Sequence, residues 1–486
     1  MKKLSILLAV LLVASMTLPA AAEVEEITVG GSLQIRGQYL DPGFGFALPG
    51  GLTGFDDDLD PQNWVSQRTL INVDARLTGG IRAFAELQAF DIWGVDETDA
   101  DSSGYLRTDS PYATLAGQGN DEIQLYQGYI ELNDLADLPL MVRVGRQELV
   151  YGREWLIGNN NDGVNFSGLS FDAAKVSYAA DLFRIDAWWS QLANNENPGN
   201  AVNLAGSSES ESNWDFMGVY GTFTGIENMA LDGYFLWART GEDFPGSVAL
   251  PVTPTLTDDV NLYTAGARFA GCWDFPAIGL IDFNVEGAYQ FGDSYEITGP
   301  APLFTATDGD YEAWAFNAVA GYTFDEVQLA PRVEVEYAYF SGDDDPLDGD
   351  VESFTRLFSD VHYGEMNVGG NLDATMTNVH VGRIGASIVP VERLTLSGDF
   401  YYFMLADDEG DVLGLGTQVA GDEDDEVGME IDVAADYQYT EDLNLRVGWA
   451  HFFAGDAIEN IDIGGGVASD DDDDVDYVYV QALLVF

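Results

Sequence analysis

The sequence predicts an all-β fold: a single transmembrane antiparallel β-barrel of about eighteen strands. Three observations predict this class. Apolar and polar residues alternate with period two over runs longer than the strands of most soluble sheets. The connections between these runs alternate between short turns and long polar loops. The chain also ends, at Phe486, on one more alternating run.

The alternation separates two kinds of side chain onto two strand faces. In residues 427–439 one face carries Val427, Met429, Ile431, Val433, Ala435, Tyr437 and Tyr439, and the other carries Glu430, Asp432, Asp436 and Gln438. Runs of about 10–15 residues have the length that a tilted strand needs to cross a bilayer. One face is therefore predicted to meet lipid and the other to line a lumen.

Eighteen runs of this kind follow one another along the chain. They are residues 27–40, 65–78, 81–94, 121–133, 140–152, 171–181, 183–194, 214–225, 229–240, 258–272, 280–295, 311–325, 327–342, 371–389, 393–408, 427–440, 442–456 and 474–486. Short connections fall at 78–80, 325–326, 390–392 and 441–442, whereas 41–64, 95–120, 195–213, 343–370 and 458–473 are long. This predicts short periplasmic turns at one rim and long acidic extracellular loops at the other.

The two ends of the chain predict where the barrel resides. Residues 1–22 have two lysines, a short apolar run and a final Ala-Ala-Ala, which is the pattern of a cleaved secretory signal peptide. The barrel then comprises residues 23–486, and the bacterial outer membrane is its expected location. Phe486, an aromatic last residue on an alternating strand, is predicted to be the signal that the outer-membrane assembly machinery recognises.

Composition excludes several classes of function. The formal net charge of −64 argues against nucleic-acid binding, and 46% hydrophobic residues argue against disorder. Cys272 is the single cysteine, which excludes an intramolecular disulfide. His362, His380 and His451 are scattered, and neither a nucleophile elbow nor an HExxH motif occurs, so no enzyme is expected.

Acid clusters raise the question of bound metal. The longest run is Asp470, Asp471, Asp472, Asp473 and Asp474 in a long loop, where carboxylates are able to hold Ca²⁺ or Mg²⁺. None of the clusters has the spacing of a known calcium loop, so solvated charge is the favoured interpretation and no cofactor is expected.

One stretch places several charges among aromatic and aliphatic residues. It is GRQELVYGREWLIG, residues 145–158, and Arg143 precedes it. Arg143 is predicted to point into the lumen. A bulge at Gly145 is expected to turn Arg146 inward as well.

Together with FSGLSFDAAKV (166–176), FSDVHYGEM (358–366), VGMEIDV (427–433) and WAHFFAGDAIE (449–459), this stretch resembles the alginate export family of outer-membrane barrels. The resemblance implies a monomeric eighteen-stranded pore that passes an anionic polysaccharide through a lumen of arginines and carboxylates. Trp155 and Leu169 stand where the family has arginines. Restoring arginine at these two positions is expected to shift ion selectivity toward anions.

Ten residues are the candidates for lumen charge and selectivity: Arg143, Arg146, Arg153, Asp172, Lys175, Glu334, Glu336, Glu430, Asp432 and Arg446. Three functions stay open: a channel for an anionic polysaccharide or other hydrophilic solutes, a cation-preferring porin for small solutes and ions, and a non-conducting scaffold or adhesin. The excess of acids favours cation preference at about 0.1 M salt. It is also typical of proteins from saline habitats, in which case it describes the surroundings and not the cargo.

Overall fold

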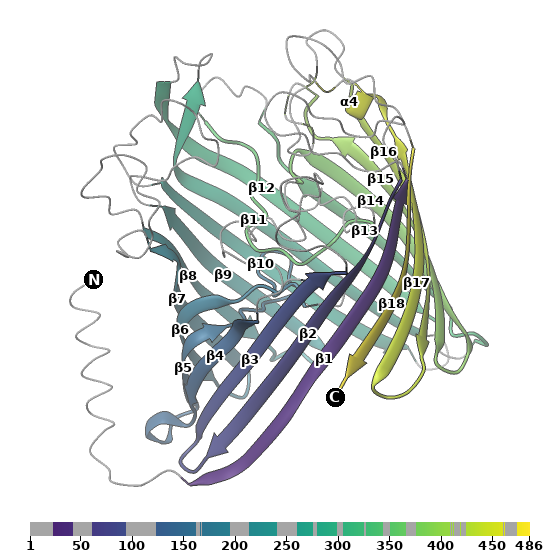
Figure 1. Ribbon diagram of the computed structural model, residues 1–486. Coiled ribbons are helices and arrows are strands. Elements are labelled where there is room, and N and C mark those ends of the chain that lie inside the picture. The colour runs from purple at the N-terminus through teal and green to yellow at the C-terminus, as the bar shows by residue number, and fades with distance from the viewer. Residues whose placement is uncertain are drawn as a thin grey trace.

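The computed structural model is a closed antiparallel barrel (Figure 1). It describes residues 23–41, 61–93, 123–161, 166, 168–194, 213–240, 260–275, 279–298, 305–324, 327–343, 350–365, 376–408, 410, 412, 418, 424–459, 461 and 474–486. Segment 1–22, the predicted signal peptide, and most of the predicted long loops lie outside these residues.

Eighteen strands form one sheet, in which each strand pairs with its neighbours in the chain. The strands are β1 (Val24–Asp41), β2 (Gln62–Leu77), β3 (Ile81–Ile92), β4 (Gln124–Leu132), β5 (Leu140–Gln147), β6 (Phe171–Ala179), β7 (Phe183–Asn194), β8 (Asn213–Phe223), β9 (Met229–Thr240), β10 (Val260–Phe275), β11 (Gly279–Thr298), β12 (Thr305–Thr323), β13 (Arg332–Phe340), β14 (Val379–Val391), β15 (Leu394–Leu405), β16 (Glu426–Gln438), β17 (Leu443–Ala454) and β18 (Val475–Val485). The predicted fold class and strand number are confirmed.

Pairing between the first and last strands closes the barrel. Ile35 of β1 lies opposite Ala482 of β18 in an antiparallel register that runs from Ser32 to Asp41. Closure matters because an open sheet edge in lipid would leave backbone N–H and C=O groups without partners. In the described residues no helix is long and apolar enough to cross a membrane.

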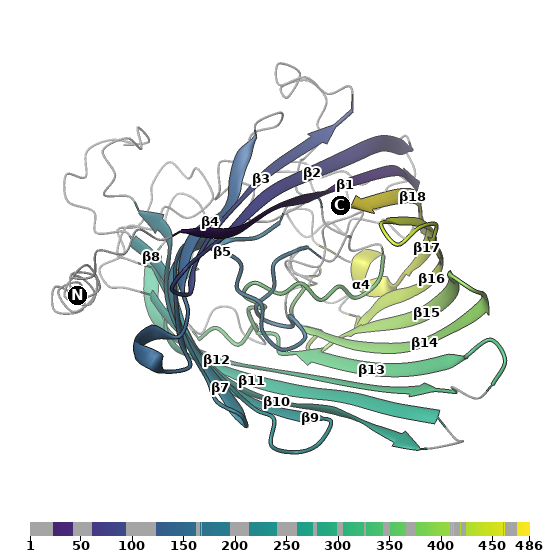
Figure 2. The ribbon, with the colours of Figure 1, turned by 90° about the horizontal axis from the view of Figure 1, so that it is seen from below.

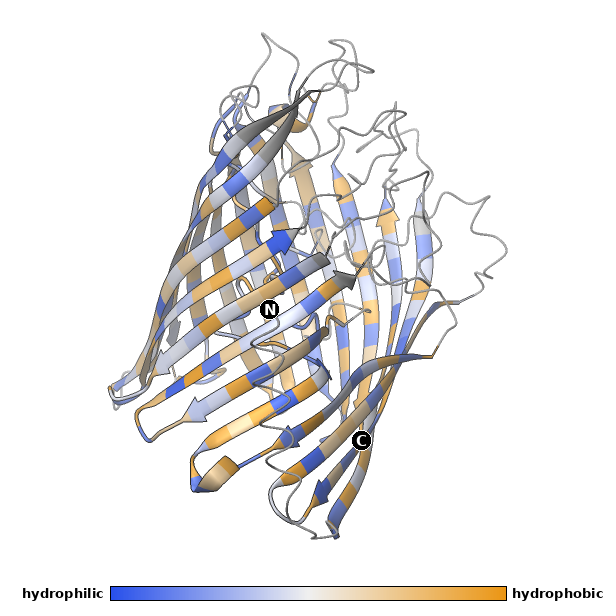
Figure 3. Cartoon of the chain, turned by 90° about the vertical axis from the view of Figure 1, so that its left-hand side faces the viewer, coloured by the Kyte–Doolittle hydropathy of each residue, from blue (hydrophilic) through white to orange (hydrophobic). Residues whose placement is uncertain are grey.

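Hydrophobic and hydrophilic residues alternate along the strands (Figure 3), and the exposure of their side chains shows that the two strand faces differ as this alternation predicts. On β16, Val433 points outward and is half exposed, whereas its neighbours Asp432 and Ala434 are buried inside the barrel. Outward side chains on most strands are large and apolar, and inward ones include most of the buried polar residues. The barrel thus has an apolar outer surface for lipid and a polar interior.

The main departure from the predicted strand boundaries concerns residues 140–152. Strand β5 ends at Gln147, and the chain then turns into the barrel instead of continuing the sheet. Gly152 and Glu154 both adopt positive φ, of 61° and 63°, which a strand does not permit. Residues 148–152 were therefore wrongly included in the strand.

Candidate functional site: the barrel interior

Two segments fold into the barrel and meet there (Figure 2). We call residues 148–160, which follow β5, the first inward segment, and residues 351–365, which follow β13, the second inward segment. Gly158 donates its backbone N–H to Phe358 at 2.7 Å, and Phe358 donates to Leu156 at 2.9 Å. Ile157 and Phe358 form a parallel bridge. The two segments therefore hold each other by strand-like pairing in the middle of the barrel.

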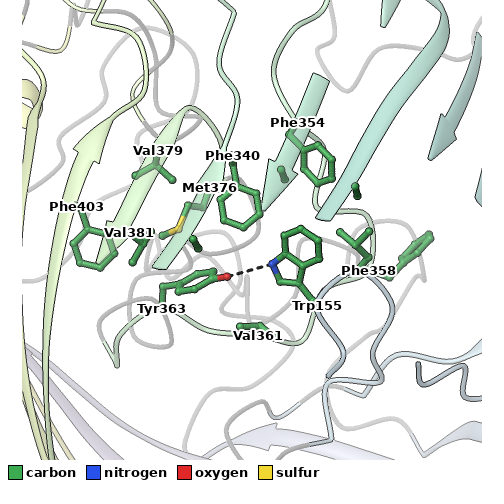
Figure 4. Packing of buried hydrophobic residues seen from close by; sticks show 14 of the residues in the cluster. Trp155, Phe340, Phe354, Phe358, Val361, Tyr363, Met376, Val379, Val381 and Phe403 are labelled. Atoms are coloured by element: carbon green, nitrogen blue, oxygen red, sulfur yellow. Dashed lines mark hydrogen bonds between the residues drawn. The ribbon is translucent and has the colours of Figure 1, made fainter. Parts of the chain in front are cut away.

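Aromatic packing fixes the inward segments to the barrel wall (Figure 4). Trp155 of the first segment is only 1% exposed and lies against Phe340 of β13 and Phe354 of the second segment. Its indole N–H donates to the hydroxyl of Tyr363 at 3.3 Å. Phe358 makes edge contacts with wall rings at 5.0 and 4.8 Å between centroids. The segments are thus a packed structure whose aromatic core lies inside the barrel.

Gly168 lies against the barrel wall, beside Arg68 of β2 and Tyr126 of β4. A Cβ atom at Gly168 would lie 2.3 Å from the guanidinium of Arg68 and 2.5 Å from the ring of Tyr126, so a larger residue would have to displace these side chains. The neighbouring Leu169 packs against the buried apolar cluster. The two positions where the family has arginine, Trp155 and Leu169, therefore face packed protein and not an open lumen.

Charged side chains form a network along the interior face of β1–β7, which we call the first wall. Arg82 of β3 donates to Asp74 of β2 at 2.9 Å. Arg143 of β5 donates to Glu131 of β4 at 2.5 and 2.8 Å, and its guanidinium lies 4.3 Å from the ring centre of Tyr129. Arg143 thus points inward, as predicted.

Lys175 of β6 extends the first wall. It lies directly opposite Arg143 and is buried. Within the described part of the chain its amine has no ion pair, because the acid on the next strand, Asp186, is held by Arg184 at 2.9 Å and by the hydroxyl of Tyr151 at 3.1 Å. Cations are in excess at this point of the wall.

We call the interior face of β9–β17 the second wall. Some of its arginines each contact more than one acid. Arg383 of β14 lies 2.6 Å from Glu334, 3.2 Å from Glu336 and 2.6 Å from Asp399. Arg153 reaches across from the first inward segment to Glu336, at 3.0 Å. The structure therefore brings the predicted Arg153, Glu334 and Glu336 into one network with Arg383.

The other predicted acids lie behind the second inward segment. Glu430 is 1% exposed and Asp432 is 6% exposed. The backbone N–H of Glu365 donates to Asp432 at 3.2 Å, and Arg446 donates to the carboxylate of Glu365 at 2.6 Å. Both acids do face the interior, but protein covers them, so they contact solutes less than the alternation alone implies.

The lumen placement predicted for Arg146 and Asp172 is wrong. They form an ion pair of 2.9 Å on the outer face, on the same side as Val144 and Val176, and their side chains are 43% and 55% exposed. Gly145 has a φ of 129°, yet the pairing of β5 with β4 and β6 continues through it without a shift. With the register unbroken, Arg146 stays on the outward face.

Burial also affects a carboxyl group at the start of the first inward segment. Glu148 accepts a hydrogen bond of 2.6 Å from the hydroxyl of Tyr126. Burial nevertheless raises the pKa of Glu148 above its ordinary value, because little water remains to solvate the charge.

The remaining predicted sites lie at the two rims. The backbone of Phe486 pairs with Gly31 of β1 through two hydrogen bonds, of 2.9 and 3.0 Å, and its ring is exposed. Of the proposed metal-binding run only Asp474 lies within the described residues, 3.6 Å from His451. No group of three or more acids, histidines or cysteines in the described part of the chain has the geometry to hold a metal ion.

Sequence reasoning missed several partners in these networks, among them Arg82, Glu131, Arg383 and Asp399. Each stands on an inward position of an alternating strand, so the period-two pattern contained the signal for its direction. What the pattern lacks is the register between strands that a long loop joins, such as β13 and β14, and therefore which side chains lie opposite one another.

Comparisons with known proteins agree with the barrel. A sequence profile of the family described as alginate export matches residues 55–465. No curated protein sequence matches the chain. The fold is similar to that of outer-membrane porins: OccAB1 of Acinetobacter baumannii (TM-score 0.56, 12% identity, covering 96% of this chain and 99% of that one) and OccK8 (OprE) of Pseudomonas aeruginosa (TM-score 0.52, 12% identity, covering 94% and 98%). At these identities the likeness concerns the fold alone.

Proposed function

The chain belongs to the alginate export family, and on this premise we propose that it passes carboxylate-bearing polysaccharides and other hydrophilic solutes through a charged lumen. The family and the porin fold make it a channel of the bacterial outer membrane and not an enzyme.

The distribution of cations carries this proposal. The chain has 19 lysines and arginines against 83 acids. The described cations that face the interior are Arg36, Arg68, Arg76, Arg82, Arg143, Arg153, Lys175, Arg184, Arg268, Arg332, Arg356, Arg383 and Arg446. Among the described residues, the only cations that lie outside the interior are Arg146, Arg239 and Arg393. A strongly acidic protein thus turns most of its described cations toward the barrel interior, although Arg36, Arg68, Lys175 and Arg356 are covered by protein.

Arginine suits an acidic polysaccharide for a physical reason. The guanidinium is planar and permanently charged, and its donors match the two oxygens of a carboxylate. Most interior arginines already contact protein acids, so a passing carboxylate would exchange with an existing partner. Such exchange binds weakly at many places, which favours passage over retention.

The second wall favours a rival function, a cation-preferring porin for small ions. Its acids outnumber its arginines, and Asp282 and Asp436 are each about one third exposed. A row of accessible carboxylates attracts cations at low salt. This rival makes a different prediction for the same experiment.

The test uses purified channel in planar bilayers and in liposomes. We expect defined conductance steps, and swelling of liposomes in oligomers of a uronic acid at a rate at least comparable with neutral oligomers of the same length. Exclusion of the acidic oligomers together with small-cation current would support the rival porin. Absence of any conductance from correctly folded protein would contradict both.

A further inference from the structure

The last strand of the barrel is too short to cover the first. Strand β18 pairs with residues Ser32–Asp41 of β1, and Phe486, which follows β18, pairs with Gly31. Strand β1 continues for seven more residues, Val24–Gly30, and in the described part of the chain β2 is their only partner strand, with a register shift between Val24 and Glu26. Figure 1 shows β1 running past the C-terminus to the lowest point of the barrel. The rim therefore has a step at the closing seam.

This step leaves a free strand edge. The N–H and C=O of Gly31 both point toward Phe486, so by the alternation of a strand those of Val29 and Ile27 point to the same open side. The register with β2 is regular from Glu26 to Leu40, and neither residue has a partner on the open side in the described part of the chain. An unpaired edge of this kind is a template for another strand.

The side chains beside the edge define what would fit it. Val29 is 67% and Ile27 is 59% exposed, which is more than most outward side chains of the barrel. Glu23, Glu25 and Glu26 lie around the same stretch and are exposed, and only Arg76 offsets them, at 3.6 Å from Glu26. The edge combines unpaired backbone groups, two exposed apolar side chains and an excess of negative charge.

We propose that residues Ile27–Val29 of β1 bind an extended, basic segment of a periplasmic protein by strand addition. In this mode main-chain hydrogen bonds supply affinity, and alternate side chains of the added strand supply specificity. Apolar side chains of the added segment lie beside Ile27 and Val29, and lysine or arginine side chains neutralise the glutamates. A second copy of this chain fits less well, because its own edge would bring the same acids together.

The first experiment measures binding of a labelled peptide of alternating lysine and valine to the full, folded chain in detergent micelles. Ile27→Pro removes one N–H from the open edge without removing a bond to β2, and edge strands tolerate proline. We expect this variant to bind about three- to tenfold more weakly, the effect of one lost hydrogen bond. Ile27→Val, which keeps the N–H, should bind as the parent does, and a glutamate–valine peptide should bind more weakly than the lysine–valine peptide.

A second measurement keeps the proposal testable if Ile27→Pro fails to fold. With Cys272 replaced by serine, Val29→Cys should form a disulfide with a cysteine-bearing lysine–valine peptide, whereas Val73→Cys on the neighbouring β2 should not. Equal crosslinking at the two positions would overturn the proposal, as would equal binding to the proline and valine variants. A dimer of the parent that Ile27→Pro abolishes, without binding of the peptide, would also overturn it in favour of a second copy.

Discussion

The two walls of the barrel interior carry opposite balances of charge. The first wall has the cations Arg36, Arg68, Arg76, Arg82, Arg143, Lys175 and Arg184 against the acids Glu26, Asp74, Glu86, Glu131 and Asp186. The second wall has the cations Arg268, Arg332, Arg383 and Arg446 against the acids Asp232, Asp282, Glu286, Glu334, Glu336, Asp399, Glu430, Asp432 and Asp436. The interior is thus polarised across its width.

Because of this difference, the net charge of the whole chain does not describe the charge that a solute meets inside the barrel. The formal net charge is −64, yet the first wall leans positive. The charge balance of the first wall thus differs from that of the whole chain, and overall composition is a poor guide to selectivity. An anion would follow the first wall and a cation the second.

The largest effect is expected where the first inward segment spans the two walls. Trp155→Ala should lower the free energy of unfolding by about 3–5 kcal/mol, because it empties a buried aromatic site between Phe340 and Phe354. Trp155→Arg should destabilise the protein at least as much, since it buries a charge without a partner, and it should not act as a simple anion-selectivity switch. Guanidinium unfolding followed by circular dichroism measures this, with Trp155→Phe as the mild control.

The next effect concerns an arginine that several acids share. Arg383→Gln should cost about 3 kcal/mol of unfolding free energy, because it leaves Glu334, Glu336 and Asp399 close together without their cation. Arg76→Gln on the first wall should cost less than about 1 kcal/mol, since its pair with Glu26 is exposed. Equal losses in the two variants would contradict the different roles assigned to them.

A smaller effect separates covered acids from accessible ones. The double change Glu430→Gln with Asp432→Asn should alter the reversal potential less than Asp282→Asn with Asp436→Asn, because the second inward segment covers the first pair. Salt-gradient recordings at about 0.1 M, where screening is still weak, provide the comparison. A larger change from the covered pair would mean that this segment leaves the wall during conduction.

The smallest effect is a pH dependence at Glu148. Its pKa is raised in the folded protein, so the folded state holds the proton more tightly than the unfolded state does. The free energy of unfolding should therefore fall as the pH rises above the ordinary glutamate value of 4.5. Glu148→Gln should flatten this slope in unfolding measured from pH 4 to pH 8. An unchanged slope would exclude Glu148 as its source.

Sequence periodicity predicted the barrel because the face on which a strand residue lies follows from its position in the local alternation. The same rule correctly turned Arg143, Glu334 and Arg446 inward. The prediction for Arg146 was wrong because it departed from this rule: Gly145 was expected to form a bulge, and the ladder contains none. The direction of a strand residue depends on an unbroken register, which a single glycine does not reveal.

The packing of the two inward segments could not be predicted from strand periodicity. Trp155 looks like a missing arginine when it is compared with the family motif, but its surroundings come from Phe340 and Tyr363, about two hundred residues later in the chain. The ion pairs of Arg383 likewise depend on the register between β13 and β14, which a long loop joins. Contacts of this kind follow from closure of the barrel and leave no local pattern in the sequence.

The polarised interior is tested most directly by reversal potentials across a salt gradient, measured for two matched double variants. Arg82→Gln with Arg143→Gln removes accessible cations from the first wall, and Asp282→Asn with Asp436→Asn removes accessible acids from the second. The account predicts shifts of opposite sign at about 0.1 M salt, toward cations for the first variant and toward anions for the second, both fading toward about 1 M as screening shortens. Shifts of the same sign, or none in either folded variant, would contradict a lumen whose two walls guide opposite charges.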